Sequence, residues 1–242
     1  MFPRLLAAVV ALAIVFTSPA GAGEVRQNPK AVLELFTSQG CSSCPAADAV
    51  LAELGKKSDI IALAYHVDYW DYIGWPDTFG DKANSDHQRA YAQRWGSSRI
   101  FTPQLVVNGA EGVVGSRRQE VDIAIQNSEL VLPVEFRSHG GMLRISIAPK
   151  AGLNESVVWL VTFVDRAEVA IERGENEGKK IVYTQIVTGR QLLGMWEPAT
   201  GARLKLPLAE VLREGSNGAV ILVQEERNGL PGRIIGAASF LR

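Results

Sequence analysis

Two cysteines separated by two residues follow closely on a short apolar segment, and this arrangement constrains the fold more than any other feature. Residues 31–36 are apolar apart from one glutamate and are typical of a buried strand. A short Ser/Gln/Gly turn leads to Cys41 and Cys44, and apolar residues at helical spacing follow them. The sequence therefore predicts a strand, a turn and a helix that begins at the second cysteine.

A cysteine pair at the start of a helix has a distinct chemistry. The first helical turn leaves backbone N–H groups without partners, and together with the helix dipole they favour a thiolate over a thiol. The thiolate is the form that attacks a disulfide. We expect Cys41 to be the attacking residue and Cys44 the resolving residue of a redox-active disulfide.

The cysteine count argues against structural uses of the motif. The chain has 242 residues and 2 cysteines, both in this motif. A disulfide that closes so short a loop removes little entropy from the unfolded chain, so it stabilises weakly. A structural zinc site needs about four protein ligands, but there is no second cysteine pair and the 3 histidines are scattered. The motif favours redox chemistry or soft-metal binding.

The first residues have the pattern of a secretory signal peptide. Arg4 is followed by the apolar residues 5–16 and the small residues 20–22, after which we expect cleavage. The apolar run is shorter than the ~20 residues of a typical membrane span, and an uncleaved anchor is the alternative. We expect a periplasmic or secreted bacterial protein without a stable membrane span. The net charge of -1 offers no basic surface for nucleic acid.

A second apolar segment, residues 60–64, predicts a strand that completes a β-α-β unit, and an aromatic-rich insertion at residues 66–84 follows it. Because open α/β sheets bind ligands beyond the carboxyl ends of their strands, the insertion is expected to form a substrate groove beside the cysteines. Its candidate substrate-binding residues are His66, Asp68, Trp70 and Trp75. The alternative is a connection that covers its own apolar surface.

The next segment predicts a helix and a β-hairpin. Residues 85–95 have helical spacing with Ser85 as the N-cap, and His87 in the first turn is interpreted as a solvated surface histidine. Residues 105–107 predict a strand that ends in an Asn-Gly hairpin turn. Pro103 directly before this strand is a candidate cis-proline, and a trans proline that only begins the strand is the alternative.

Glu34 and His66 supply two further hypotheses. If Glu34 is buried in the first strand, its pKa rises and it could exchange a proton with the second thiol; an edge position in water is the alternative. Soft thiolates select copper(I), so Cys41 and Cys44 with His66 are an alternative metal site. Otherwise we expect no metal and no cofactor beyond the disulfide.

The order of the predicted elements, with the cysteine pair after the first strand and Thr102-Pro103 before the hairpin, resembles the thioredoxin fold over residues 30–130. The resemblance implies a redox-active pair with a cis-proline packed beside it. The residues that it implies for the site are Cys41 as nucleophile, Cys44 as resolving thiol, Pro103 with Thr102 as the cis-proline pair, and, if the turn has one inserted residue, Glu34 as the buried acid.

The whole chain also looks like a member of the DUF1223 family, which comprises exported bacterial proteins with a thioredoxin-like domain and no established function. This likeness is carried by ELFTSQGCSSCPAAD (34–48), HVDYWDYIGW (66–75) and TPQLVVNG (102–109). It implies a fold but no substrate. The chain lacks a tryptophan before the first cysteine and Gly-Pro between the cysteines, which argues against general reductase activity.

After residue 130 the pattern changes to short apolar strands between turn signals, which predicts a mostly antiparallel, sandwich-like β domain. The expected organisation is a signal peptide (1–22), an α/β thioredoxin-like domain (28–130) and a β-rich domain (131–242). The expected function is an exported thiol–disulfide oxidoreductase that acts on a protein or a small thiol or disulfide through a mixed disulfide. The alternatives are copper(I) handling and a non-catalytic binding module.

Overall fold

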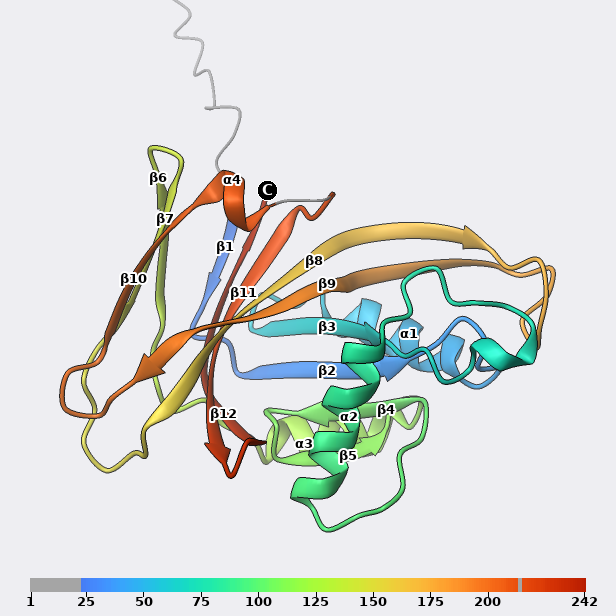
Figure 1. The fold of residues 1–242 in the computed structure, drawn as a ribbon, viewed down its shortest axis with the longest axis horizontal. Coiled ribbons are helices and arrows are strands. Elements are labelled where there is room, and N and C mark those ends of the chain that lie inside the picture. The colour runs from blue at the N-terminus through green and yellow to red at the C-terminus, as the bar shows by residue number, and fades with distance from the viewer. Residues whose placement is uncertain (1–22, 213–214) are drawn as a thin grey trace, which may run out of the picture.

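The structure, a computed structural model, describes residues 23–212 and 215–242 (Figure 1). The signal peptide expected at residues 1–22 lies outside them. The helices are α1 (Cys44–Leu54), α2 (Lys82–Arg94), α3 (Arg118–Gln126) and α4 (Leu208–Val211), with a 3-10 helix η1 (Asp71–Ile73). The strands are β1 (Glu24–Gln27), β2 (Ala31–Thr37), β3 (Ile60–His66), β4 (Gln104–Val107), β5 (Glu111–Val114), β6 (Glu135–His139), β7 (Met142–Ile147), β8 (Ser156–Ala170), β9 (Lys180–Trp196), β10 (Ala202–Pro207), β11 (Gly218–Arg227) and β12 (Leu230–Leu241).

One large sheet connects the early and late parts of the chain. Its strand order is β1-β12-β11-β8-β9-β3-β2-β4-β5. The pairs β2–β3 and β3–β9 are parallel, and its other neighbouring pairs are antiparallel. A single register pair, Ala64 with Ile186, joins β3 to β9. The chain is therefore a mixed α/β protein with a large, mostly antiparallel sheet, and the regions on either side of residue 130 share that sheet.

Strands β8 and β9 form a hairpin that reaches from the late part of the sheet to the end of the molecule that carries the cysteines (Figure 1). They have 15 and 17 residues, longer than the other strands described. Residues 171–179 connect them, and we call this connection the hairpin tip. The hairpin brings residues from late in the sequence to a loop that precedes α1.

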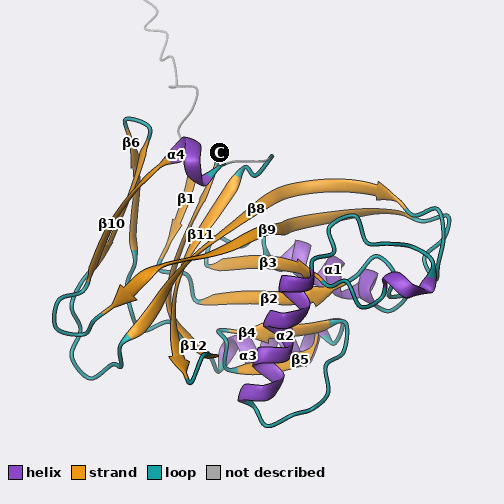
Figure 2. Cartoon of the chain, in the orientation of Figure 1, coloured by secondary structure: helices purple, strands orange, loops and turns teal. Residues whose placement is uncertain are grey.

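Three hydrophobic cores fix the layers. The first lies between the three-stranded sheet β10-β7-β6 and the late strands of the large sheet, which gives the sandwich-like arrangement expected there. The second lies under α2, and the third under α1 and α3 on the opposite face. Helices α1, α2 and α3 gather around β2–β5 (Figure 2). We call the two faces of this part of the sheet the α1 face and the α2 face.

Side chains of β2 alternate between these faces, as they do in any strand. Leu33 and Leu35 pack in the core of the α1 face, whereas Val32 and Phe36 pack in that of the α2 face. Glu34 therefore points to the α2 face, away from α1.

The structure confirms the predicted hairpin turn and corrects the start of α2. Asn108 and Gly109 have φ values of 47° and 64° and occupy the central positions of a turn in which the N–H of Ala110 donates to the carbonyl of Val107 at 3.0 Å. Helix α2 begins before the predicted Ser85, because the Asp81 side chain caps it by accepting a hydrogen bond from the N–H of Ala83 at 2.8 Å. None of the helices in the described part of the chain has the length and apolar character needed to span a bilayer.

Candidate functional site

Cys41 and Cys44 form a disulfide at the N-terminus of α1. Pro45 lies in the first turn of the helix, where its missing N–H leaves no hydrogen bond unmade. The predicted pairing and helix start are confirmed. Both cysteines have an exposed fraction of 0%, so the disulfide is covered in the state described.

The peptide bond between Thr102 and Pro103 is cis, as the sequence predicted. Gln104 pairs with Phe36 in the antiparallel β2–β4 register, so Pro103 lies beside the end of β2. Residues 38–43, which we call the cysteine loop, begin there and lead to α1. Trp70 of the insertion joins the two segments. Its Nε1 donates to Thr102 Oγ1 at 2.8 Å, and its side chain packs so closely on Gly40 that a Cβ there would lie 3.1 Å from Trp70 Cβ.

A buried polar network ties the insertion to the cysteine loop. Asp77 Oδ2 accepts from the N–H of Gln39 at 2.7 Å and lies 2.8 Å from His66 Nδ1. The Gln39 side chain accepts from Trp75 Nε1 at 2.8 Å. Burial raises the pKa of Asp77, but the charge and hydrogen bond of His66, together with the hydrogen bonds from the N–H groups of Gln39 and Phe79, outweigh it and leave that pKa below its usual value.

Three of the four predicted substrate-binding residues, His66, Trp70 and Trp75, therefore make contacts that hold the cysteine loop in place, and the fourth, Asp68, does not. His66 is fully buried and acts through Asp77, while Trp70 and Trp75 are partly exposed beside the loop. Asp68 instead accepts a hydrogen bond from Ser85 of α2, so it anchors the insertion to the helix.

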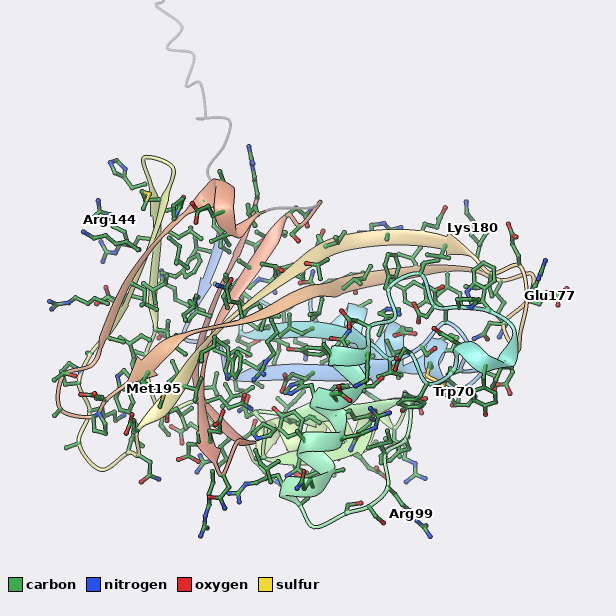
Figure 3. The ribbon with its side chains drawn as sticks, viewed as in Figure 1. Trp70, Arg99, Arg144, Glu177, Lys180 and Met195 are labelled. Atoms are coloured by element: carbon green, nitrogen blue, oxygen red, sulfur yellow. A yellow bond between two sulfur atoms is a disulfide. The ribbon has the colours of Figure 1, made fainter. Side chains whose placement is uncertain are left out.

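The hairpin tip covers the cysteine loop from another side. Asn176 is fully buried, and its Nδ2 donates to the carbonyl oxygens of Gln39 at 2.8 Å and of Cys41 at 2.9 Å. The N–H of Ser42 donates to Glu175 Oε2 at 3.1 Å. In Figure 3, Trp70 lies at the same end of the molecule as Glu177, which is part of the hairpin tip, and Lys180, the first residue of β9. The disulfide thus lies between the insertion and the hairpin tip.

Sequence reasoning missed Asn176 because it lies 135 residues from Cys41 and carries no local signal. It also missed Asp48, which lies four residues after Cys44 on the buried side of α1. Positions four apart share a helix face, so this spacing was visible in the sequence.

Asp48 is a second buried carboxylate on the side of the disulfide, in addition to Asp77. Burial raises the pKa of Asp48 to about 7. Its Oδ1 accepts from Thr37 Oγ1 at 2.9 Å, while its Oδ2 is buried without a partner in the described part of the chain. A buried carboxylate with one hydrogen bond is poorly stabilised as an anion, so it holds its proton up to near neutral pH.

Glu34 is buried as one hypothesis required, with 1% exposed, but on the α2 face. Its Oε1 lies 3.1 Å from His87 Nε2, and its Oε2 accepts from the Tyr91 hydroxyl at 2.6 Å. Burial raises the pKa of Glu34, but the hydrogen bonds from His87 and Tyr91 and the nearby charge of Arg190 more than offset it and leave the pKa lowered. The prediction of a solvated His87 is wrong: the residue is 8% exposed and packs against Tyr65 and Tyr91.

No group of three or more His, Cys, Asp or Glu side chains within residues 23–212 and 215–242 is arranged to hold a metal ion. The alternative copper(I) set of Cys41, Cys44 and His66 is thus not assembled in the disulfide state. Reduced thiols are required for that set, so copper(I) binding stays a prediction.

These features define a class: an α/β protein with a covered disulfide at a helix N-terminus, next to a cis X-Pro bond. The chain belongs to the family described as a protein of unknown function (DUF1223), which it matches over residues 32–224. The sequence-based assignment to this family is confirmed.

Two solved structures are similar to the chain. The crystal structure of protein AGR_C_4864 from Agrobacterium tumefaciens is 32% identical, covers 89% of this chain and 96% of its own, and has a TM-score of 0.79. HBP35 of Porphyromonas gingivalis is 14% identical, covers 88% of this chain and 75% of its own, and has a TM-score of 0.59, a likeness of fold alone. No curated protein matches the chain.

Proposed function

We propose that the protein is an exported thiol–disulfide oxidoreductase with a thioredoxin-like arrangement around Cys41 and Cys44. The observation that carries the proposal is that the only two cysteines of the sequence form a disulfide at a helix N-terminus beside the cis Thr102–Pro103 bond. A bridge over so short a loop contributes little to stability, so a chemical role explains it better. The signal-like pattern before residue 23 supports export to an oxidising compartment.

The reaction begins from the oxidised pair. A substrate thiolate attacks Sγ of Cys41, a mixed disulfide forms, and the bond to Cys44 breaks, so that Cys44 leaves as a thiolate and takes up a proton. A second substrate thiolate then attacks the substrate sulfur of the mixed disulfide and releases Cys41, which also takes up a proton. Two substrate thiols become one disulfide, and the protein disulfide becomes two thiols. The reverse sequence reduces a substrate disulfide.

Asp48 is the proposed proton donor to Cys44, in place of the Glu34 expected from the sequence. It lies one helical turn after Cys44, and its pKa of about 7 leaves it largely protonated below neutral pH. A general acid works best when its pKa is near the working pH. Its donation keeps the leaving Cys44 from returning to Cys41 as a thiolate.

Because the insertion and the hairpin tip cover the disulfide, the reaction needs a state in which one of them has moved away from it. The hairpin tip is held on the cysteine loop mainly by polar contacts of Asn176 and Glu175. A few hydrogen bonds of about 1 kcal/mol each permit opening without unfolding the sheet. The proposed enzyme is therefore gated, and its rate is limited by movement of the hairpin tip or of the insertion.

The test measures turnover of insulin and of a cysteine-containing peptide in both directions. Wild type, Cys41→Ser, and Asn176→Ala as a variant with a loosened cover are compared. Turnover should be abolished in Cys41→Ser and raised in Asn176→Ala, and Cys44→Ala should trap a mixed disulfide with its partner. If wild type and Asn176→Ala are no faster than Cys41→Ser, the proposal is wrong.

The same proteins separate the alternatives. Copper(I) handling requires the reduced protein to bind copper(I) more tightly than a free dithiol, with weaker binding in His66→Ala. A non-catalytic binding module requires the double Cys→Ser variant to complement a deletion strain fully.

A further inference from the structure

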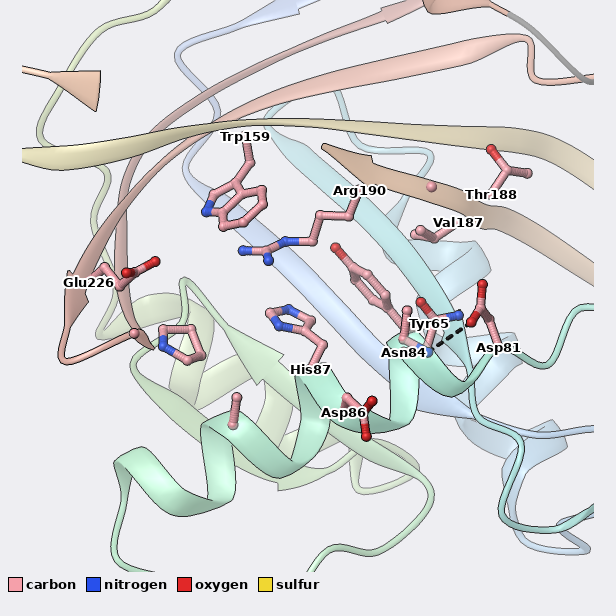
Figure 4. Close-up of a pocket in the computed structure, with 15 residues that line it drawn as sticks. Tyr65, Asp81, Asn84, Asp86, His87, Trp159, Val187, Thr188, Arg190 and Glu226 are labelled. Carbon is pink, nitrogen blue, oxygen red and sulfur yellow. Dashed lines mark hydrogen bonds between the residues drawn. The ribbon is translucent and has the colours of Figure 1, made fainter. Parts of the chain in front are cut away.

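A cleft on the α2 face, opposite the disulfide, has a volume of about 550 Å³. It lies between α2, strands β8 and β9 and the β11–β12 turn (Figure 4). Clefts of ~300–1,000 Å³ are typical of small-molecule sites. The cleft shares no lining residue with the cysteine loop, so a site here is independent of the proposed redox chemistry.

His87 presents one bare ring nitrogen on the wall of this cleft. Its Nε2 lies 3.1 Å from Glu34 Oε1, and the pKa of Glu34 is lowered, so Glu34 is a carboxylate and His87 Nε2 carries the shared hydrogen. Burial and the charge of Arg190 lower the pKa of His87, so the ring is neutral. The other nitrogen, Nδ1, is then a hydrogen-bond acceptor, and it has no partner among the described residues.

Arg190 presents hydrogen-bond donors that the protein leaves unused. Its guanidinium is stacked on Trp159, 3.5 Å from the ring centroid, and Nη2 donates to Gln224 Oε1 at 2.9 Å. Its Nε is buried without a partner, and none of the carboxylates described in the structure forms a salt bridge with it. A guanidinium held rigidly with free donors is suited to bind a carboxylate.

Glu34 does not accept a hydrogen bond from the free donors of Arg190, although its carboxylate lies near the guanidinium. Both of its oxygens already have partners, in His87 and Tyr91. The Tyr65 hydroxyl on the same wall is fully buried, and it too has no hydrogen-bond partner in the described chain. Figure 4 shows Tyr65, His87 and Arg190 converging on one region of the cleft. Unmatched polar groups at one place indicate a missing polar ligand.

The rim of the cleft has the opposite charge. Asp81, Asp86 and Glu226 line it. Asp86 is paired with Lys82 and Arg89, and Asp81 caps α2, whereas Glu226 forms no salt bridge within the described residues. A simple anion would be repelled at this rim. A ligand that carries both charges would match the rim and the interior at once.

We propose that this cleft binds a small zwitterion of the amino-acid class. Its carboxylate accepts hydrogen bonds from Arg190, and its ammonium group donates to Nδ1 of His87 and faces Glu226. The side chain of the ligand occupies the rest of the cleft. Binding fills the hydrogen bonds that Arg190 and His87 lack in the free protein.

The experiment screens the common L-amino acids and L-norleucine by thermal shift and then measures binding by isothermal titration calorimetry. Hexanoate and pentylamine, which match L-norleucine but lack its ammonium and its carboxylate respectively, are the control ligands. At least one zwitterion should bind with a Kd at or below about 1 mM, and its analogues lacking either charge should bind at least about tenfold more weakly. If no amino acid binds, or if the carboxylate alone binds equally well, the proposal is overturned.

Variants locate the site. Arg190→Gln should weaken binding at least about tenfold, with a smaller loss for Arg190→Lys, which keeps the charge but not the fork of donors. His87→Gln provides a second test should Arg190→Gln fail to fold. The control Arg144→Gln changes an exposed arginine of β7 at the other end of the molecule (Figure 3) and should have no effect. Cys41→Ser should also bind normally, and equal affinity in all variants would place the ligand elsewhere and refute the assignment.

Discussion

The two faces of the large sheet bury carboxylates that differ in charge, as Asp48 and Glu34 show. On the α1 face, burial raises the pKa of Asp48 to about 7, and among the described residues its one hydrogen-bond donor is the hydroxyl of Thr37. On the α2 face, burial has the same tendency, but hydrogen bonds from His87 and Tyr91 lower the pKa of Glu34. Hydrogen-bond partners, and not depth, decide which buried carboxylate is charged.

The difference suggests a division of roles. A buried acid that titrates near neutral pH can exchange protons, which suits Asp48 to the thiol chemistry proposed beside it. A buried carboxylate that stays ionised sets the charge and tautomer of its neighbours, which suits Glu34 to holding His87 beside the cleft. Each role can be tested on one face while the other serves as the control.

The largest expected effect is that of Glu34→Ala. It leaves His87 and Tyr91 buried without their common acceptor, and removal of one partner from such a buried network costs about 3–5 kcal/mol. Urea unfolding at pH 7 measures the loss. The matched change Glu111→Ala, at an exposed glutamate of β5, should stay within about 0.5 kcal/mol of wild type.

The pH dependence of this loss has a fixed sign. The folded-state pKa of Glu34 lies below its ordinary value of 4.5. Its stabilising contribution is therefore present above that value and is lost as the pH falls through the folded-state pKa. An unchanged stability of Glu34→Ala at pH 7 would mean that the network on the α2 face contributes nothing.

The second expected effect concerns Asp48→Asn. The contribution of Asp48 to stability depends on pH with the opposite sign to that of Glu34. The pKa of Asp48 rises from 3.8 to about 7 on folding, so the folded state binds the proton more tightly. Wild type is then most stable below the unfolded-state pKa and loses about 4 kcal/mol as the pH rises through the folded-state pKa. Asparagine does not titrate, so the stability of the variant relative to wild type should rise by that amount between pH 4 and pH 8.

Urea unfolding across this pH range measures the effect. Asp59→Asn, which makes the same change at an exposed aspartate before β3, is the control. If the difference between Asp48→Asn and wild type does not change with pH, Asp48 is ionised in the folded state and cannot be the proton donor.

The third effect concerns the cover on the α1 face. Asn176→Ala removes two hydrogen bonds to the cysteine loop, and each is worth about 1 kcal/mol. Opening should become at least about tenfold more frequent, and the disulfide should be reduced by dithiothreitol faster by that factor. Asn154→Ala, at an exposed asparagine before β8, is the control. Equal reduction rates would mean that the hairpin tip does not limit access.

Local patterns predicted the elements around the cysteines but not the contacts that cover them. Apolar periodicity located β2, α1 and β3, and Thr102-Pro103 before a strand indicated the cis bond that the structure contains. The cover depends on Asn176, whose position follows from the length and register of the β8–β9 hairpin, a tertiary property that no local pattern encodes.

The two buried histidines illustrate the same limit. His87 was interpreted as solvated because it stood in the first turn of the predicted helix, but it lies four residues before Tyr91 and shares the buried face of α2 with it. The residue that caps the helix is Asp81, four residues before the predicted N-cap Ser85. His66 was singled out from the sequence as a candidate site residue, but its hydrogen-bond partner Asp77 lies beyond η1 and was not.

The smallest expected effect is that of Trp70→Phe, which removes one hydrogen bond, from Nε1 to Thr102 Oγ1, and keeps most of the packing on Gly40. The variant should lose about 1 kcal/mol. Thr102→Val removes the same bond from the other side, so the double variant should be less destabilised than the sum of the two by about 1 kcal/mol. Unfolding by urea gives all three values.

The double-mutant cycle of Trp70→Phe and Thr102→Val also tests whether the disulfide on the α1 face and the cleft on the α2 face are independent. Trp70 links the insertion to the cis Thr102–Pro103 segment on the side of the disulfide, and the α2 cleft has no part in that contact. Dithiothreitol should therefore reduce the disulfide of Trp70→Phe faster, while the affinity of an amino acid for the cleft stays unchanged. Strictly additive losses in the cycle would show that Trp70 only fills space, and the cis-proline segment would then be held beside the cysteine loop by the β2–β4 register alone.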